Sequence, residues 1–190
     1  MLRGQIPTTK GGSLQFGAGS GGSIGGVAHY FFPWTQLPSA ATVAATTGVW
    51  VAWPMYFPGL AITKLCCELT TAGVGNGRIA LWDSDPASGL PAALLADSGN
   101  FSVNVALGIL ENTISSFTFP DRTVWIGFNA NVAASFRQGS QNFALPITSG
   151  TDFQGVRRGV SRTVAFGAPP DPYGTPAGTV FGGPLLAVKA

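Results

Sequence analysis

Short apolar runs with a period of two residues constrain this fold more than any other feature of the sequence. Residues 64–69 (KLCCEL), 101–107 (FSVNVAL) and 124–128 (VWIGF) place an apolar side chain at every second position. Residues 79–81 and 160–166 continue the pattern. Alternation at this period puts apolar side chains on one face of an extended strand, so each run predicts a half-buried β-strand.

The runs are separated by short segments rich in Gly, Pro, Asn and Asp, which are typical of turns. These segments are 72–77 (AGVGNG), 83–86 (DSDP), 98–100 (SGN), 119–121 (FPD) and 149–150 (SG). Residues 90–95 hold the best helical pattern, of one or two turns at most. Many short strands with such punctuation predict an all-β domain, an antiparallel sandwich or barrel, over residues 41–190.

The N-terminal part has a different composition. Eight of the sixteen residues in the segment 11–26 (GGSLQFGAGSGGSIGG) are glycine. Glycine at this density opposes folding through its chain entropy, so the segment reads as a flexible arm unless a partner orders it. The apolar residues Leu14, Phe16 and Ile24 are spaced through it, and such residues on an arm favour docking onto another surface.

Aromatic residues and prolines follow the Gly-rich stretch, in residues 29–38 (HYFFPWTQLP). We interpret Tyr30, Phe31, Phe32 and Trp34 as anchoring or subunit contacts, and residues 1–40 as an extended arm that attaches to another protein or to a neighbouring subunit. The alternative is an extended stretch that packs on its own domain.

Charge is scarce, and its scarcity excludes several functions. Only 9% of the residues are charged, against about 25% in an ordinary soluble domain, and the net charge is +2. Such a chain has no strong field for nucleic acid or for an anionic membrane. Pro and Gly interrupt the uncharged window 37–62, so we expect no transmembrane segment. The first residues lack the apolar run of a signal peptide.

Side chains for catalysis or metal binding are also few. The chain has one histidine, His29, and two adjacent cysteines, Cys66 and Cys67. One His and two adjacent Cys do not supply a catalytic triad or an ordinary zinc site. Neighbours in a strand point to opposite faces, so we expect no disulfide here, and one buried and one half-buried thiol. The sequence predicts a protein that is not an enzyme and holds no cofactor or metal.

Asp83 and Asp85 allow three interpretations. At the end of a strand, an Asp-x-Asp-Pro sequence commonly fixes a turn through hydrogen bonds from the backbone to the carboxylates. A structural cation bound by these oxygens is the second interpretation. A glycosidase acid pair is the third.

Trp82, Arg157 and Arg158 are further candidates for ligand contact. Trp82 alternates with the aliphatic residues of its strand, which places it on the other face, exposed or buried between subunits. An exposed indole would suit carbohydrate stacking, whereas packing in a core is the alternative. Arg157 and Arg158 lie between Gly155 and Gly159, where the default interpretation is a solvated loop. The alternatives are a contact with an anionic glycan or phosphate on a cell envelope, or with a carboxylate of a neighbouring subunit.

Residues 78–99 (RIALWDSDPASGLPAALLADSG) resemble a module of tailed-bacteriophage virion proteins, in which a strand ending in Asp-x-Asp runs into a Gly-Leu-Pro segment. Residues 62–73, 119–127, 165–173 and 182–188 are similar to other segments of that family. The resemblance covers about residues 40–190. It implies a jelly-roll β-sandwich, commonly trimeric, that serves a virion as a structural protein or an adhesin. Ala92 departs from the family pattern, which has a second glycine there, and the arm lies outside the match.

The resemblance and the composition together favour a structural protein of a tailed-phage virion, assembled in the host cytoplasm. We expect a homotrimeric tail fibre or baseplate receptor-binding protein, whose arm contacts other virion proteins. A capsid decoration or head-fibre protein is the first alternative. A carbohydrate-binding module or lectin, and a glycosidase acting through Asp83 or Asp85, are the others.

Overall fold

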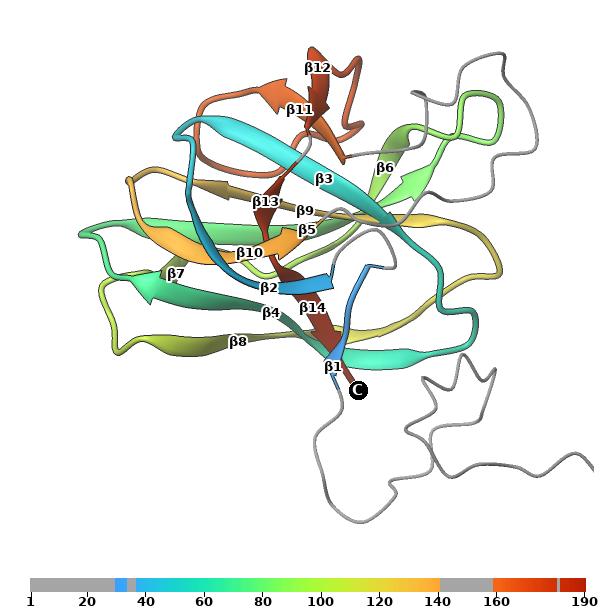
Figure 1. Ribbon diagram of the computed structural model, residues 1–190. Coiled ribbons are helices and arrows are strands. Elements are labelled where there is room, and N and C mark those ends of the chain that lie inside the picture. Colours follow the sequence, from blue (N-terminus) through green and yellow to red (C-terminus); the bar gives the residue numbers. More distant parts are fainter. Residues whose placement is uncertain (1–29, 34–36, 141–158, 181) are drawn as a thin grey trace, which may run out of the picture.

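The described part of the chain folds into two antiparallel β-sheets that face each other (Figure 1). This computed structural model describes residues 30–33, 37–140, 159–180 and 182–190. Each sheet has seven strands, and the described residues contain no helix. Consequently no helix in this part of the chain is long and apolar enough to cross a membrane. The all-β, two-sheet architecture expected from the alternating runs is confirmed.

Sheet 1 is built around the long strand β4, which has β8 along one edge and β14 and β10 along the other. β1 adds to β14, while β2 and β13 add to β10. The strands of sheet 1 are β1 (Tyr30–Phe31), β2 (Leu37–Ala44), β4 (Ala61–Thr71), β8 (Gly108–Thr118), β10 (Ser135–Ser140), β13 (Gly183–Pro184) and β14 (Leu186–Lys189).

Sheet 2 has the strand order β12-β11-β3-β9-β5-β6, and β7 pairs with β5 beyond the end of β6. Its strands are β3 (Val49–Met55), β5 (Asn76–Ser84), β6 (Pro91–Asp97), β7 (Phe101–Ser102), β9 (Val124–Ala130), β11 (Gly159–Thr163) and β12 (Gly178–Val180).

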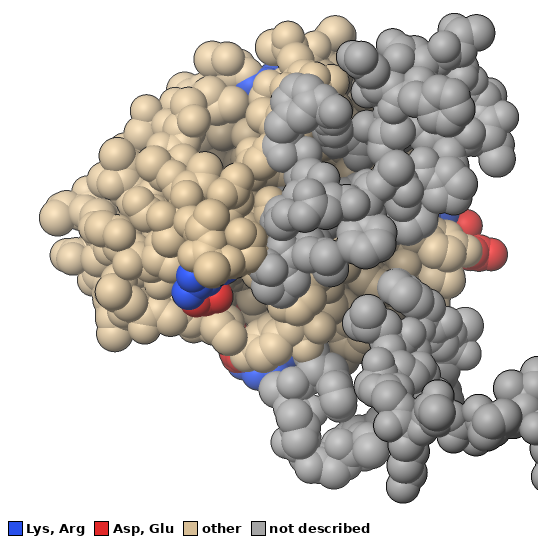
Figure 2. All heavy atoms as spheres, in the orientation of Figure 1, with Lys and Arg blue, Asp and Glu red and all other residues tan. Residues whose placement is uncertain are grey.

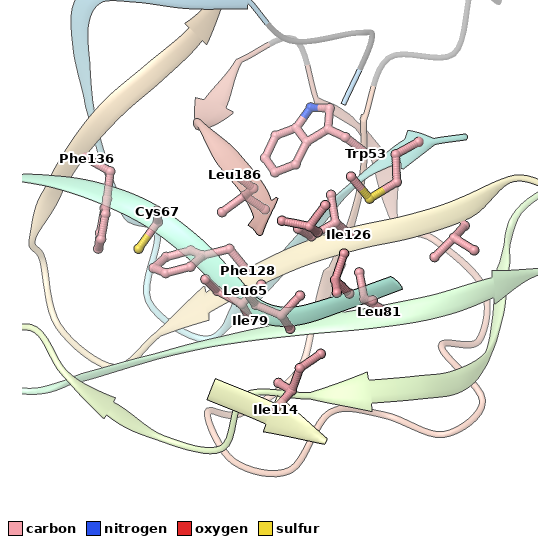
Figure 3. Packing of buried hydrophobic residues seen from close by; sticks show 14 of the residues in the cluster. Trp53, Leu65, Cys67, Ile79, Leu81, Ile114, Ile126, Phe128, Phe136 and Leu186 are labelled. Carbon is pink, nitrogen blue, oxygen red and sulfur yellow. The ribbon is translucent and has the colours of Figure 1, made fainter. Parts of the chain in front are cut away.

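The main core lies between the two sheets and takes the alternate apolar residues of their strands (Figure 3). The rings of Phe128 from sheet 2 and Phe136 from sheet 1 meet edge to face, with centroids 4.7 Å apart. The labelled residues of this core are Trp53, Leu65, Cys67, Ile79, Leu81, Ile114, Ile126, Phe128, Phe136 and Leu186. Apolar burial of this extent is what stabilises a sandwich that has no disulfide among its described residues.

A second apolar cluster covers the outer face of sheet 2. It contains Trp50, Ala52, Ala80, Trp82, Trp125, Val160 and Tyr173. Residues 164–177, which we call the cover segment, lie against this face. The backbone NH of Tyr173 donates to the carbonyl of Ala92 (2.7 Å), and the indole NH of Trp82 donates to the carbonyl of Pro170 (2.9 Å). Because sheet 2 is buried on both faces, all seven residues of β9 are buried.

Two local expectations were wrong. Residues 101–107 do not form one strand: β7 ends at Ser102, and Val103 instead bonds to the 73–75 turn through its NH and its carbonyl. Residues 90–95 are not helical, because 91–97 form β6 against β5. In both places hydrogen bonds to another segment, the preceding strand β5 for residues 91–97 and the 73–75 turn for Val103, outweighed the local pattern.

The N-terminal boundary also differs from the expected one. β1 and β2 belong to sheet 1, although residues 30–40 fall in the range predicted as an arm. The ring of Phe31 packs edge to face on that of Phe57, with centroids 5.6 Å apart, and Phe32 is half-buried. For these residues the alternative of packing on their own domain is the one observed.

Candidate functional site

The Asp83–Asp85 segment lies where β5 turns toward β6. The Asp85 carboxylate accepts hydrogen bonds from the backbone NH of Ala87 (2.9 Å) and from the NH (2.7 Å) and hydroxyl (3.0 Å) of Ser88. The bonds from Ser88 and then Ala87 lower the pKa of Asp85. This carboxylate therefore fixes the turn, as the turn interpretation predicted.

Asp83 is held by Arg122, which lies in the loop before β9. The Nε and Nη2 atoms of Arg122 lie 2.5 and 2.7 Å from the two carboxylate oxygens of Asp83. This two-point contact is the main cause of the lowered pKa of Asp83. A cation or a substrate at Asp83 would have to displace the guanidinium.

An open hollow of about 440 Å³ lies beside this ion pair, lined by Asp83, Ser84, Asp85 and Arg122 among others. Both of its carboxylates are already engaged by groups of the protein. The described residues contain no group of three or more His, Cys, Asp or Glu side chains that could hold a metal ion. The hollow thus offers a ligand mainly the remaining donors of Arg122, whose side chain is 55% exposed.

Trp82, predicted as a surface contact, is completely buried. The centroid of its ring lies 5.1 Å from that of Trp50 and 5.0 Å from that of Tyr173, both edge to face. Alternation placed Trp82 correctly on the outer face of its sheet, but the cover segment closes that face. Trp125 is buried on the same face, with its indole NH donating to Ser84 (3.0 Å) and to the carbonyl of Gly89 (3.2 Å). Sugar stacking on Trp82 is therefore ruled out in this state.

A polar cluster on the outer face of sheet 1, which we call the Glu111 cluster, was not predicted. The Glu111 carboxylate accepts hydrogen bonds from Lys64, from Lys189 (2.6 Å) and from the Tyr30 hydroxyl (2.5 Å). These residues come from β8, β4, β14 and β1. Lys189, Lys64 and Tyr30, in that order, lower the pKa of Glu111 to about 2. The same contact with Glu111 is the main cause of the raised pKa of Tyr30.

Cys66 lies beneath this cluster and is more buried than expected, since 1% of it is exposed and Cys67 is 2% exposed. Cys66 pairs with Glu111 across β4 and β8, on the outer face, whereas Cys67 belongs to the main core. Desolvation raises the pKa of Cys66 to about 12 and raises that of Cys67 as well. Neither thiol is a ready nucleophile, because the thiolate is the reactive form.

The remaining carboxylates of the described residues have partners too. Arg78 forms a two-point ion pair with Asp97, and Arg137 donates two bonds to Glu68 (2.8 and 3.1 Å). Asp121 accepts the Tyr56 hydroxyl and Asp171 accepts the backbone NH of Leu94. On the face shown in Figure 2, most of the visible blue and red atoms lie side by side in small groups, while one blue group at the top has no red atoms beside it.

Exposed apolar side chains gather at one end of the sandwich, which we call the apolar end. Among the described residues five large apolar or aromatic side chains are exposed, and four of them, Val74 (86%), Val105 (41%), Leu107 (61%) and Ile109 (54%), belong to this end. The 101–107 run predicted as a strand supplies two of them. The second half of the run thus marks a surface, whereas Phe101 and Val103 pack in the main core.

Two loops build the apolar end and are bonded to each other. The carbonyl of Val103 accepts the NH of Gly73, and its own NH donates to the carbonyl of Gly75, both at 3.1 Å. Beside them lies a hollow of about 350 Å³, whose lining includes Val105, Ile109 and Glu111. The arrangement is an apolar surface on ordered loops, next to the Glu111 cluster.

Six of the predicted contact residues lie outside the described residues: Leu14, Phe16, Ile24, Trp34, Arg157 and Arg158. Of the described candidates, Tyr30 joins the Glu111 cluster, Phe31 packs on the sandwich and Phe32 is half-buried. Asp83 and Asp85 share a turn. The structure does not bring these candidates together into one site.

Comparison of the chain with protein-family models, with curated proteins and with solved structures finds no match.

Proposed function

We propose that this chain is a non-enzymatic structural protein of a tailed-phage virion, with a jelly-roll sandwich that assembles as a trimer. We further propose that the trimer belongs to a tail fibre or baseplate and attaches to the host surface. The apolar end is the observation that carries the proposal. Contiguous apolar patches of more than a few hundred Å² are rare on monomeric proteins. Four exposed aliphatic side chains gathered at one end of the sandwich are typical of a surface that meets another protein.

The residues that carry the family resemblance have structural roles, which supports this proposal. Residues 78–99 form the β5–β6 hairpin at the edge of sheet 2. Arg78 and Asp97 join its two strands by an ion pair, and Asp85 fixes its turn. These charged residues maintain the hairpin, as expected of a motif that specifies a fold and not a reaction.

The use of the carboxylates supports a role without catalysis. A general acid or base needs a carboxyl group that can exchange its proton with a substrate. In the described part of the chain, each Asp and Glu accepts a hydrogen bond from a side chain or a backbone NH. Those with shifted pKa values, Asp83, Asp85 and Glu111, are shifted downward, which keeps them ionised.

Attachment through a trimer needs no strong single site. Three identical subunits present three copies of any weakly binding loop, so their contacts with a repetitive host surface add up to firm binding. The exposed Arg122 beside the Asp83 turn is one such loop contact. Its remaining donors suit uncharged oxygens of a host-surface glycan, because the ionised Asp83 and Asp85 make the hollow acidic.

Gold-labelled antibodies against this chain, applied to purified phage particles, test the proposal. We expect label at the tail or the baseplate. Label on the head would contradict a receptor-binding role at the tail and would support the alternative of a capsid decoration protein. Absence of the chain from purified particles, checked by mass spectrometry, would overturn the virion assignment.

Binding of the purified full chain to host cells tests the adhesive part separately. We expect Arg122→Gln to weaken binding, while Arg137→Gln, at an ion pair on the other sheet, leaves it unchanged. Release of sugar from host envelopes that is abolished by Asp83→Asn would show a glycosidase and contradict the non-enzymatic role.

A further inference from the structure

We propose that the apolar end of one subunit binds the Gly-rich segment, residues 11–26, of a neighbouring copy of this chain. The inference rests on the oligomer proposed above and names the two surfaces that meet in it. One surface is Val74, Val105, Leu107 and Ile109; the other is a stretch of sequence that lies outside the described residues.

The two partners match in chemical character. The Gly-rich segment carries no charged residue and places Leu14, Phe16 and Ile24 among glycines and serines. The four side chains of the apolar end are uncharged as well. The ions beside them are already paired: Glu68, opposite Ile109 in β4, with Arg137, and Glu111 with Lys64 and Lys189. Burying apolar side chains of both partners is favourable, and no unpaired ion has to be desolvated.

The size of the apolar end favours a chain segment over a whole domain as its occupant. A stable contact between two folded bodies covers roughly 800 Å² on each partner. Three aliphatic side chains on two loops and Ile109 at the start of β8 supply only part of such an area. An extended segment with three apolar side chains, by contrast, needs only shallow apolar sites such as the hollow beside Val105 and Ile109.

The direction of β1 favours a neighbouring copy over the same chain. β1 pairs antiparallel with β14, which pairs antiparallel with β4, so β1 and β4 run the same way. The chain therefore reaches Tyr30 from the Ala61 end of β4, whereas the apolar end follows Thr71 at its other end. Docking on the same subunit would require the segment to turn back along the sandwich.

Length allows the contact between copies but does not require it. Strand spacings place Tyr30 about 20 Å from Ile109 of the same subunit, and the 29 residues before Tyr30 can span up to about 100 Å when extended. The choice of a neighbouring copy therefore rests on the direction of β1 and is tested by crosslinking. A contact in which one surface of a subunit meets a different surface of the next is heterologous. Three such contacts can close a ring, which agrees with a trimer.

Disulfide trapping in the full chain tests this contact. The variant Gln15→Cys with Ala106→Cys places thiols in the Gly-rich segment and on the exposed loop of the apolar end. The control combines Gln15→Cys with Thr118→Cys, an exposed position at the far end of β8. The native thiols are buried and protonated, so they stay out of the reaction under mild oxidation.

We expect covalent dimers and trimers from the Ala106 pair and single chains from the Thr118 pair. Crosslinks within single chains, equal crosslinking of both pairs, or none with the Ala106 pair would overturn the inference. Sedimentation of the unmodified chain separates the two proposals. A trimer that does not crosslink at Ala106 leaves the oligomer intact and refutes this contact, whereas a monomer refutes both.

A second variant avoids introduced thiols. Leu107→Ser changes an exposed side chain, so the sandwich should remain folded by circular dichroism. We expect it to shift the sedimentation of the full chain from trimer toward monomer, while Thr118→Ser does not. A Leu107→Ser trimer as stable to dilution as the wild type would contradict the inference.

Discussion

Replacing Trp82 by Phe tests whether the outer face of sheet 2 is a closed core. The change removes the hydrogen bond to the Pro170 carbonyl, worth about 1 kcal/mol. The smaller ring also leaves a void between Trp50 and Tyr173, so the total loss of unfolding free energy should be about 2–3 kcal/mol. With a urea slope of about 1–3 kcal/mol/M, the unfolding midpoint measured by circular dichroism should fall by roughly 0.7–3 M.

Tyr56→Phe is the matched control, because it also removes a polar group from an aromatic side chain. Tyr56 is 42% exposed and donates its hydroxyl hydrogen bond to Asp121 at 2.5 Å. Loss of an exposed bond of this kind should cost less than about 0.5 kcal/mol. Equal midpoints for Trp82→Phe and the wild type would refute the packing described for this face, and would reopen Trp82 as a binding residue.

Three further predictions concern the charge, the backbone and the thiols. Glu111→Gln should lower the free energy of unfolding at pH 7. The difference in unfolding free energy between this variant and the wild type, measured in urea, should shrink as the pH falls from about 4.5 to about 2, where the lowered pKa of Glu111 lies. A difference that stays constant with pH would contradict the Glu111 cluster. Gly127→Ala should lower the melting temperature, because a Cβ there would lie 2.8 Å from the Trp82 ring, whereas Gly167→Ala, with nothing within 4 Å, should not. Cys66 and Cys67 should react with a thiol reagent at pH 8 only after unfolding, because both are buried and their pKa values are raised; rapid labelling of the folded chain would contradict this.

The strands were the most predictable part of the fold. Alternation at 64–69 and 124–128 identified β4 and β9, because each contributes one face to the core between the sheets. The run at 101–107 is an exception, because its apolar residues alternate as in a strand, yet two of them are exposed at the apolar end. A pattern of apolar residues predicts burial against something, and that partner can be another chain.

Long-range contacts explain what the sequence did not reveal. The burial of Trp82 depends on the cover segment, whose Pro170 lies 88 residues away in the sequence. Alternation therefore predicted the face of the sheet on which Trp82 lies, but not that the cover segment packs over it. Lys64 lies 47 residues from Glu111 and Lys189 lies 78 residues from it. The small number of charged residues was the one sequence signal that could have predicted the Glu111 cluster. In a chain with so few charged side chains, each of them was a candidate for an ion pair within the fold.

Assembly through exposed apolar surface is the central claim, and the mass of the full chain in solution tests it most directly. Sedimentation equilibrium at several concentrations should give three copies of the 19.5 kDa chain. A species that remains a single 19.5 kDa chain at every concentration would contradict the account, because the apolar end would then be stable in water without a partner.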